Sequence, residues 1–511
     1  MFSKVNGSAI VGMESHNIQI EVDITAGLPS FEIVGLPDAA VREARVRVKS
    51  AIRNSQFEFP SRRIHVNLAP ADLKKIGASF DLPIALGILA ATGQLNISRE
   101  PGFVAIGELS LDGRLREVPG ALSIAIGASS TRAPFLLVPR GNSLEAALVS
   151  GVRVYGVSTL GEAISFLEGR ISVNPTKVDV SEMLSSNGHF CPDLSEVKGQ
   201  EPSKRALEVA AAGGHNMLMI GPPGSGKTML ARRLPGILPP MTVEEALEVT
   251  RIQSVAGMIP PNGSLVTSRP FRSPHSSTSS VGLTGGGVPV PRPGEVTLAH
   301  NGVLYLDELP LFQRNAIEAL RGPLEDRMVT IVRSMFPVTF PARFSLIASM
   351  NPCPCGYLGD PARECNCSIG DIKRYRARIS GPLLDRIDIQ IEVPRLGRRE
   401  ILERKPGESS EQVRKRVTLA RMIQEERLGS EGIHSNADMT HAQVERFCKL
   451  GDEEERFMAL AISKLSLSAR SFERILKVAR TIADLTESER IRIEHLAEAV
   501  QYRCLDRTFF N

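Results

Sequence analysis

Eight consecutive residues carry the clearest chemistry in this sequence. They fit the pattern G-x-x-x-x-G-K-[ST] at every constrained position: Gly221, Pro222, Pro223, Gly224, Ser225, Gly226, Lys227 and Thr228. The glycines let successive backbone N–H groups turn inward around phosphates, while Lys227 would reach the β- and γ-phosphates and the Thr228 hydroxyl would hold Mg²⁺. An ordinary glycine turn before a helix, which is the alternative, would not also require the Lys-Thr pair. This phosphate loop (P-loop) therefore predicts that ATP and Mg²⁺ bind here.

Two later segments end in polar residues that would complete a hydrolysis site. Asp307 and Glu308 end a buried apolar run. We expect Asp307 to hold Mg²⁺ through water and Glu308 to orient and deprotonate the attacking water. Asn351 ends a second apolar run and could bond the γ-phosphate or that water; the alternative is that it only caps the turn before Pro352.

Four of the seven cysteines form a cluster directly after Asn351. They stand in two close pairs, C-x-C: Cys353, Cys355, Cys365 and Cys367. Four thiolates so arranged can close a tetrahedral site around Zn²⁺, and the glycines Gly356 and Gly359 allow the chain to double back. The alternative is a group of unliganded, partly buried thiols.

Composition and charge bound the class of protein. A chain of 511 residues suggests about three domains, and 42% hydrophobic with 23% charged residues is an ordinary globular balance. A net charge of +4, from 61 basic and 57 acidic residues, permits an anionic partner without requiring one. No apolar run approaches the roughly 18 residues of a membrane helix, and Met1–Val11 lacks a signal-peptide core. We therefore expect a cytoplasmic protein without a membrane partner, whose cysteines are thiols or metal ligands.

Residues 1–168 are expected to form an α/β domain. Ile18, Ile20, Val22 and Ile24 alternate with polar residues, as in a half-buried strand, and 38–52 is typical of a helix. Strand and helix signals continue to alternate as far as a closing helix at 159–167. The turn-rich stretch 169–190 is expected to be a linker.

Two segments of this domain resemble the proteolytic domain of Lon. Residues 75–79 (Lys-Ile-Gly-Ala-Ser) resemble the segment that bears its nucleophilic serine, and residues 107–114 resemble its later strand and turn. The resemblance implies that Ser79 takes the nucleophile's position, but the lysine that would activate it is replaced by Leu122. We therefore expect no peptidase activity, with Ser79 a remnant of ancestry or a helix N-cap beside Asp81; an active peptidase is the alternative.

The P-loop and the two polar strand ends together resemble an AAA+ ATPase core, expected over residues 191–395. Residues 197–200 (Val-Lys-Gly-Gln) resemble the segment that contacts adenine in that superfamily. Residues 383–388 (Leu-Leu-Asp-Arg-Ile-Asp) resemble the arginine-finger segment of magnesium-chelatase and MCM helicase relatives. The resemblance implies that Arg386 acts on the nucleotide of a neighbouring subunit. The alternative is a surface ion pair with Asp385 or Asp388.

Residues 396–511 are expected to form an α-helical lid. Arg470, at the start of an amphipathic helix, matches the sensor arginine of AAA+ lids, which would read the γ-phosphate; the alternative is an ordinary exposed arginine. A capping box, Thr486-x-x-Glu489, is expected to open the last helix.

The expected core contains two insertions that a minimal ATPase lacks. Residues 271–301, rich in Pro, Gly and Ser, are expected to form a long loop, and residues 328–340 a hairpin turning at Ser334-Met335. Both resemble the insertions of magnesium-chelatase and MCM relatives, which line the pore of helicase rings. Four arginines in or beside them could hold DNA phosphates: Arg269, Arg272, Arg327 and Arg333.

The order of these domains, with Asn351-Pro352-Cys353-Pro354-Cys355-Gly356 (within the cysteine cluster 353–367) and residues 478–485 of the lid, resembles the YifB/ComM family. The resemblance implies a hexameric, ATP-hydrolysing motor on single-stranded or branched DNA, acting as a ComM-like helicase that promotes branch migration in recombination or natural transformation. It implies no small-molecule substrate beyond ATP. The alternative is a magnesium-chelatase-type ATPase subunit that remodels a protein partner.

Overall fold

The computed structural model describes residues 1–97, 102–186, 191–259, 265–287, 290–333, 336–361, 363–397, 407–465 and 467–503. The chain divides into two compact units. The N-terminal unit comprises residues 1–187 and 243–267, and the P-loop unit comprises residues 188–242 and 268–511. Among the described residues, no helix is both long and apolar enough to span a lipid bilayer.

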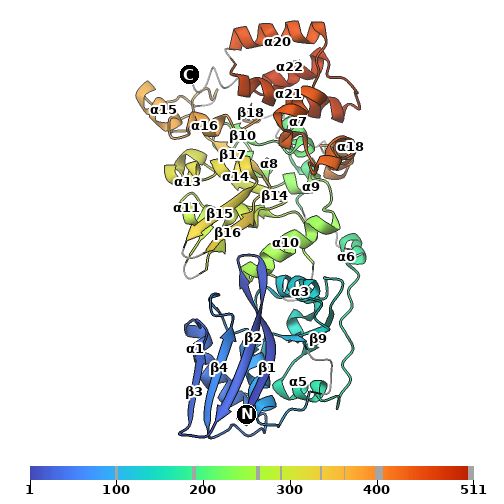
Figure 1. Ribbon diagram of the computed structural model, residues 1–511. Helices are drawn as coiled ribbons and strands as arrows, with labels where there is room; N and C mark the ends of the chain where they lie inside the picture. The colour runs from blue at the N-terminus through green and yellow to red at the C-terminus, as the bar shows by residue number, and fades with distance from the viewer. Residues whose placement is uncertain are drawn as a thin grey trace. The chain divides into compact units, whose positions relative to one another are not determined.

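The N-terminal unit is built on a seven-stranded mixed sheet of order β3-β4-β2-β1-β5-β8-β9 (Figure 1). Its elements are β1 (Phe2–Val11), β2 (Glu14–Thr25), β3 (Ser30–Val34), α1 (Ala39–Asn54), β4 (Arg63–Ala69), α2 (Asp81–Ala91), β5 (Val104–Ala105), β6 (Glu108–Leu109), β7 (Leu115–Arg116), α3 (Ala121–Ser130), β8 (Phe135–Pro139), α4 (Ser143–Ala146), β9 (Arg153–Val157), α5 (Leu160–Leu167), α6 (Val180–Ser186) and α10 (Val243–Ala256).

Hydrophobic alternation determines how β2 lies in this sheet. Ile18, Ile20, Val22 and Ile24 are at most 2% exposed, because every second side chain of the strand faces the helices α2 and α3. Asp38 caps α1 by accepting a hydrogen bond from the N–H of Val41 at 2.8 Å. The predictions of a strand and of a helix at these positions are confirmed.

Two positions of the Lon-like comparison, Leu122 and Ser79, lie in this unit. Leu122 is fully buried in α3, and its N–H donates to Glu145 Oε1 at 2.9 Å. The expectation that Ser79 caps a helix is wrong, because α2 begins at Asp81 after Phe80 and no side chain caps it. The Asp81 carboxylate instead forms a buried ion pair with Arg47.

Helix α10 belongs to the N-terminal unit although it lies between α9 and β11 in the chain. It packs beside α3 (Figure 1), where Ser254 donates to the buried carboxylate of Glu145 and Arg251 donates to Ser123 Oγ at 3.2 Å. Burial raises the pKa of Glu145. The ATPase core expected over 191–395 is therefore interrupted by a segment that folds with the N-terminal residues.

The P-loop unit is built on a five-stranded parallel sheet of order β11-β14-β17-β10-β18. The elements of its sheet region are α7 (Glu201–Gly213), β10 (Met217–Ile220), α8 (Lys227–Ala231), α9 (Leu234–Ile237), β11 (Phe271–Arg272), α11 (Ser280–Thr284), β12 (Gly285–Gly286), β13 (Arg292–Pro293), α12 (Glu295–Leu298), β14 (Gly302–Leu306), α13 (Arg314–Glu318), α14 (Arg321–Asp326), β15 (Met328–Arg333), β16 (Phe336–Pro341), β17 (Phe344–Met350), α15 (Ile369–Arg376), α16 (Gly381–Leu384) and β18 (Ile389–Glu392). Strand β10 is buried at all four positions, as a central parallel strand should be.

The stretch 271–301 is more ordered than expected. The prediction of a loop is wrong, because β11 joins the central sheet beside β14, and β12 pairs with β13 between two short helices. The prediction of a hairpin at 328–340 is confirmed by the antiparallel pairing of β15 with β16, although Ser334 and Met335 at its turn lie outside the described residues. A Cβ on Gly285 would lie 3.1 Å from Ile331 Cδ1, so the two insertions pack against each other.

The C-terminal part of this unit is helical, in agreement with the expected lid (Figure 1). Its helices are α18 (Ser410–Leu428), α19 (His441–Phe447), α20 (Asp452–Leu465), α21 (Ala469–Leu485) and α22 (Ile493–Gln501). Helices α18 and α21 pack on α7. The capping-box prediction is wrong: Thr486 ends α21, its hydroxyl donating to carbonyls of that helix, and α22 begins only at Ile493.

Candidate functional site

A pocket of about 560 Å³ opens at the carboxyl ends of the parallel strands of the P-loop unit. Ligands of open α/β sheets bind at this edge, because the loops that follow the strands converge there. The lining residues include Val197, Lys198, Gln200, Pro223 to Leu230, Asp307, Glu308, Ser349, Met350, Asn351 and Leu396. The predicted P-loop, both predicted carboxylates, Asn351 and the adenine-contact segment thus meet in one cavity, whose volume suits a nucleotide.

Glycine is required at three positions of the P-loop. Gly224 and Gly226 have φ of 76° and 93°, in the left-handed region that side chains with a Cβ rarely occupy. A Cβ on Gly221 would lie 2.2 Å from the carbonyl oxygen of Val393. The loop can therefore turn tightly into α8, as a phosphate cradle requires.

Lys227 points back into the P-loop. Its Nζ donates to the carbonyl oxygens of Gly221 at 2.7 Å and Pro222 at 3.0 Å, and to Asn351 Oδ1 at 3.4 Å. Burial lowers the pKa of Lys227, and the nearby carboxylates of Asp307 and Glu308 oppose that shift. A cation that is 8% exposed and held by neutral acceptors is poised to take an anionic partner.

Thr228 and Asp307 lie as a pair of Mg²⁺ ligands should. Thr228 Oγ1 donates to Asp307 Oδ2 at 3.0 Å, and Ser349 Oγ donates to the other carboxylate oxygen. The Tyr305 hydroxyl bonds both Thr228 Oγ1, at 3.2 Å, and Ser349 Oγ, at 3.1 Å. Burial raises the pKa of Tyr305 to about 12, so this hydroxyl stays a neutral donor.

Glu308 is held in a strained backbone conformation. Its φ of 52° lies in the left-handed region, which costs a non-glycine residue about 1–3 kcal/mol. Its N–H donates to Asp307 Oδ1 at 3.1 Å and to Ser349 Oγ at 3.3 Å, and these bonds help to fix the turn. The exposed Glu308 side chain lines the pocket, where its carboxylate could accept a proton from a bound water.

Alternation along the strands could have revealed the two polar residues that the sequence analysis missed. Ser349 precedes Asn351 by two residues, and Tyr305 precedes Asp307 by two. Side chains two apart on a strand share a face, so each lies behind the residue that was predicted. Gln200 was included only as part of a resembling segment; its side chain donates to Pro394 O at 2.6 Å and Ser225 O at 3.3 Å, which ties the P-loop to the chain after β18.

Arg386 and Arg470 do not line this pocket within the chain. Arg386 donates to the carboxylate of Glu325 on α14 and to Pro382 O at 2.7 Å. The exposed Arg470 lies close enough to Glu325 to help lower the pKa of that carboxyl, the Arg386 hydrogen bond being the larger cause. The ion pair considered as the alternative for Arg386 thus forms, but with Glu325 rather than with Asp385 or Asp388.

Asp388 has another role. Its buried carboxylate pairs with Arg474 of α21, and it accepts the N–H of Asn216 at 3.2 Å and lies 3.4 Å from His215 Nδ1. Burial acts to raise the pKa of Asp388, but the charges of Arg474 and Lys477 and the hydrogen bond with His215 hold that pKa well below its usual range. Asn216 also donates to the Arg386 carbonyl at 2.9 Å, so the sheet positions the Arg386 segment.

Three of the four arginines considered for DNA contact already have partners within the chain. Arg269 donates to the carbonyls of Pro239 and Asn301, and Arg272 forms a two-pronged ion pair with Glu295 at 2.7 and 2.9 Å. Arg327 pairs with Asp438 and donates to Phe344 O. The side chain of Arg333 lies outside the described part of the chain. By contrast, Arg292 on β13 is exposed.

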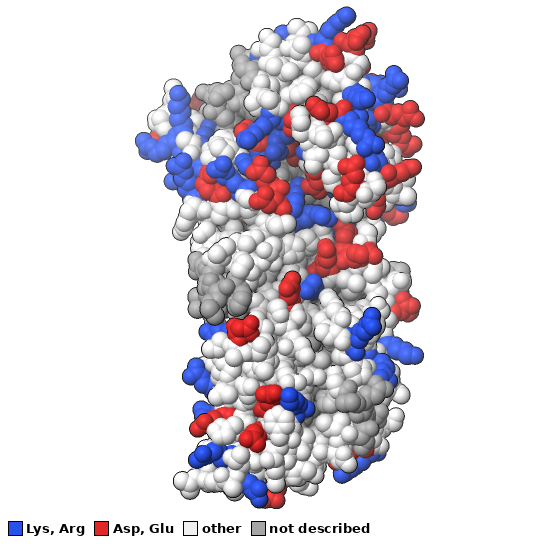
Figure 2. Space-filling model, viewed as in Figure 1, with Lys and Arg blue, Asp and Glu red and all other residues white. Residues whose placement is uncertain are grey.

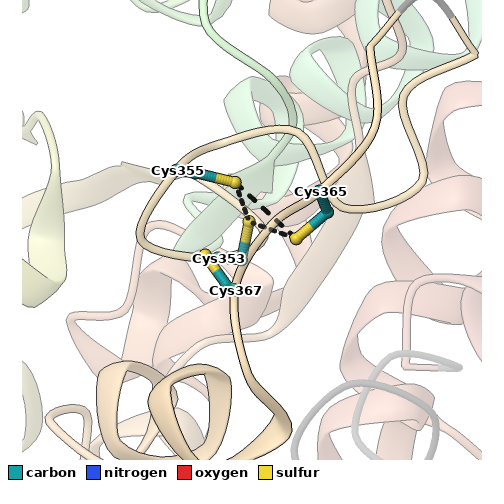
Figure 3. A group of neighbouring side chains, drawn as sticks. All are labelled: Cys353, Cys355, Cys365 and Cys367. Carbon is teal, nitrogen blue, oxygen red and sulfur yellow. Dashed lines mark hydrogen bonds between the residues drawn. The ribbon is translucent and has the colours of Figure 1, made fainter.

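The four clustered cysteines converge (Figure 3). The sulfur of Cys353 lies 3.4 Å from that of Cys355 and 3.6 Å from that of Cys365, and all four sulfurs lie within 4.8 Å of one another. In a tetrahedral Zn–S₄ site, with bonds of about 2.3 Å, neighbouring sulfurs are about 3.8 Å apart. The N–H of Tyr357 holds the pKa of Cys355 at about 6, with help from the neighbouring thiols. This cluster could hold a metal ion.

Three family models match this chain. "Magnesium chelatase, subunit ChlI" matches residues 193–401, "Subunit ChlI of Mg-chelatase" matches residues 20–142, and "Magnesium chelatase, subunit ChlI C-terminal" matches residues 407–503. The three ranges cover the P-loop, both strand-end carboxylates, the cysteine cluster and the helical C-terminal part.

The chain is similar over almost its whole length to proteins of several bacteria. It is 45% identical to competence protein ComM of Haemophilus influenzae, over 98% of this chain and 97% of the relative. It is 45% identical to the uncharacterised protein YifB of Escherichia coli, over 99% of this chain and 97% of the relative. A shorter match, 27% identical, is to Lon protease 2 of Bacillus subtilis, over 32% of this chain and 33% of that protein.

Proposed function

Because the chain belongs to the magnesium-chelatase-like AAA+ family that contains ComM and YifB, we propose that it is an ATP-hydrolysing, ring-forming motor that acts on DNA. The observation that carries the proposal is that the P-loop, Asp307, Glu308 and Asn351 line one pocket of the P-loop unit. The Thr228–Asp307 pair fits Mg²⁺, and the P-loop fits a triphosphate. When bound, Mg²⁺ would neutralise phosphate charge.

The residues of the chain divide the hydrolytic work among them. Lys227 gives up its carbonyl partners to hold the phosphates, and Asn351, which faces it, orients the terminal phosphate or the water. Glu308 takes the proton from that water. Arg386 supplies a charge from the neighbouring subunit after leaving Glu325, and Arg470, beside the same carboxylate, reads the γ-phosphate. This chemistry requires an oligomer, for which we propose a hexameric ring.

We expect a few arginines on the two insertions, rather than a broad positive surface, to contact DNA. On the face shown in Figure 2, Lys and Arg side chains are intermixed with Asp and Glu over the C-terminal helices, so the described residues of this face form no wide basic patch there. The insertion that contains the exposed Arg292 packs against the hairpin that contains Arg333. We propose that these two arginines, rather than Arg269, Arg272 and Arg327, contact phosphates, with single-stranded or branched DNA as the substrate and branch migration as the ComM-like activity.

A second candidate is a chelatase-type ATPase that remodels a protein partner. The names of the three matching family models favour it. It predicts that a partner protein, and not DNA, stimulates ATP turnover.

We expect Glu308→Gln to bind ATP but to hydrolyse it about 10²–10⁴-fold more slowly, because the amide cannot accept the water's proton. Binding by calorimetry and turnover by phosphate release would separate the two effects. Glu487→Gln is the matched control, since Glu487 is also an exposed glutamate with positive φ, 53°, and should leave turnover unchanged. Retained turnover in Glu308→Gln would place the base elsewhere.

We expect Arg386→Ala and Lys227→Ala each to lose hydrolysis alone and to recover part of it when mixed. A mixed ring contains interfaces at which an intact P-loop meets an intact Arg386. Mixing Lys227→Ala with Glu308→Gln is the control and should restore nothing, because each pocket then carries one defect. Steady-state ATPase rates across mixing ratios check this; equal, negligible rates in both mixtures would rule out a finger acting across subunits.

We expect single-stranded or branched DNA to bind and to stimulate hydrolysis. Arg292→Ala or Arg333→Ala should weaken DNA binding similarly for all sequences. Each substitution should also reduce the number of counterions released on binding, measured from the salt dependence of affinity, by about one for each phosphate contact that is lost. Arg456→Ala, an exposed arginine on α20, is the control and should change neither. DNA that neither binds in a salt-dependent way nor stimulates turnover, with a protein partner that does, would establish the chelatase-type alternative.

We propose that the cysteine cluster holds Zn²⁺, the usual ion for four thiolates. Purified protein should carry about one equivalent of zinc, and Cys365→Ser should lose most of it. Cys191→Ser, which changes a cysteine outside the cluster, should keep the metal. Elemental analysis decides the matter: wild-type protein that is folded yet free of metal would contradict the site.

A further inference from the structure

The cysteine cluster lies against the nucleotide pocket through Gly356. A Cβ on Gly356 would come within 2.7 Å of Pro223 Cδ, 2.8 Å of Pro223 Cγ and 3.8 Å of Asn351 Cγ. Gly356 is itself buried, and its N–H donates to the carbonyl oxygen of Cys353 at 3.0 Å. The backbone of the cysteine loop thus packs directly on the second proline of the P-loop.

The two ends of the loop are also joined to the site. At one end, Pro352 O accepts hydrogen bonds from Arg376 Nε at 3.3 Å and Nη2 at 3.2 Å, and the N–H of Asn351 bonds to the Tyr375 hydroxyl. At the other end, Cys367 directly precedes Ser368, the N-cap of the helix α15 that bears both of these side chains. Closing the loop therefore fixes the strand end at Asn351 and the helix packed on it.

The described part of the loop has little apolar core of its own. Its described residues, 353–361 and 363–367, contain no helix or strand, and Cys353 is their only buried hydrophobic side chain. The exposed Arg363 guanidinium lies 4.2 Å from the ring centre of the half-buried Tyr357. One ion pair also ties the loop to the chain after β18, with Arg395 Nη1 lying 3.8 Å from the buried Asp360 carboxylate. Ordering a loop of this length costs conformational entropy that such contacts cannot offset. A metal bound by four thiolates can, because its binding energy becomes folding energy.

We propose that the metal held by these cysteines positions the ATP site: it presses Gly356 against Pro223 and keeps Asn351 opposite Lys227. Loss of the metal frees the loop, relaxes the P-loop and weakens nucleotide binding while the rest of the unit stays folded. The inference rests on nucleotide binding at this pocket, which is part of the proposed function, but it does not depend on DNA.

Two glycines of the loop provide a matched test. Gly356 and Gly359 have φ of 86° and 78°, so alanine imposes a similar backbone penalty at both. Only at Gly356 does the added methyl group meet Pro223, since a Cβ on Gly359 has nothing within 4 Å. We expect Gly356→Ala to keep zinc but to bind a fluorescent ADP derivative about tenfold more weakly, and Gly359→Ala to bind it within about twofold of wild type.

Metal removal is the second arm of the test. Chelator-treated wild-type protein should bind the ADP derivative about as weakly as Gly356→Ala, and restored zinc should restore affinity. Chelation of Gly356→Ala should add little further loss, because both changes act through one contact. If Gly356→Ala loses its zinc or fails to fold, Pro223→Ala removes the same contact from the P-loop side and should weaken binding with the metal retained.

The outcomes separate the inference from the proposed function. Unchanged affinity in chelated, folded wild-type protein, or equal affinities in Gly356→Ala and Gly359→Ala, would overturn the coupling while leaving nucleotide binding intact. Wild-type protein that binds no nucleotide at all would overturn both.

Discussion

One geometric constraint underlies the whole site: neighbouring parallel strands end at the same edge of a sheet. Strand β17 pairs with β10 on one side and β14 on the other, so the residues that follow these three strands must meet. The P-loop follows β10, Asp307 follows β14 and Asn351 follows β17. The order of the strands alone brings these groups to one edge of the sheet. The other contacts of the pocket then adjust the positions of their side chains.

Hydrogen bonds behind the pocket fix the positions of the groups that the strand ends bring together. Ser349 bonds both Asp307 and the N–H of Glu308, so one hydroxyl links β17 to the end of β14. The left-handed conformation of Glu308 is strained, and the network helps to offset that cost. Tyr305 and Ser349, which lie behind the pocket, therefore help to fix the positions of Thr228, Asp307 and the Glu308 backbone.

Much of this arrangement was predictable from local patterns. Alternating Ile and Val residues predicted β2. The glycine spacing, the Asp-Glu strand end and the cysteine spacing located groups that the structure brings into the pocket or beside it. The failures share a cause: short polar motifs fit several local structures. The segment from Thr486 to Glu489 has the residue types of a helix start, yet Thr486 ends α21. In the stretch 271–301, β11 pairs with β14, and composition does not reveal that partner.

The sequence by itself determined the features that depend on covalent geometry and short-range patterns: left-handed turns that need glycine, side chains that alternate along a strand, and four thiols close enough to share an ion. The tertiary structure alone decided which distant group each charged side chain meets. It placed Arg386 on Glu325, Arg272 on Glu295 and Gly356 on Pro223. Such pairings depend on the packing of whole elements. An arginine can bond many carboxylates, and the residues next to it in the sequence do not show which carboxylate it will meet.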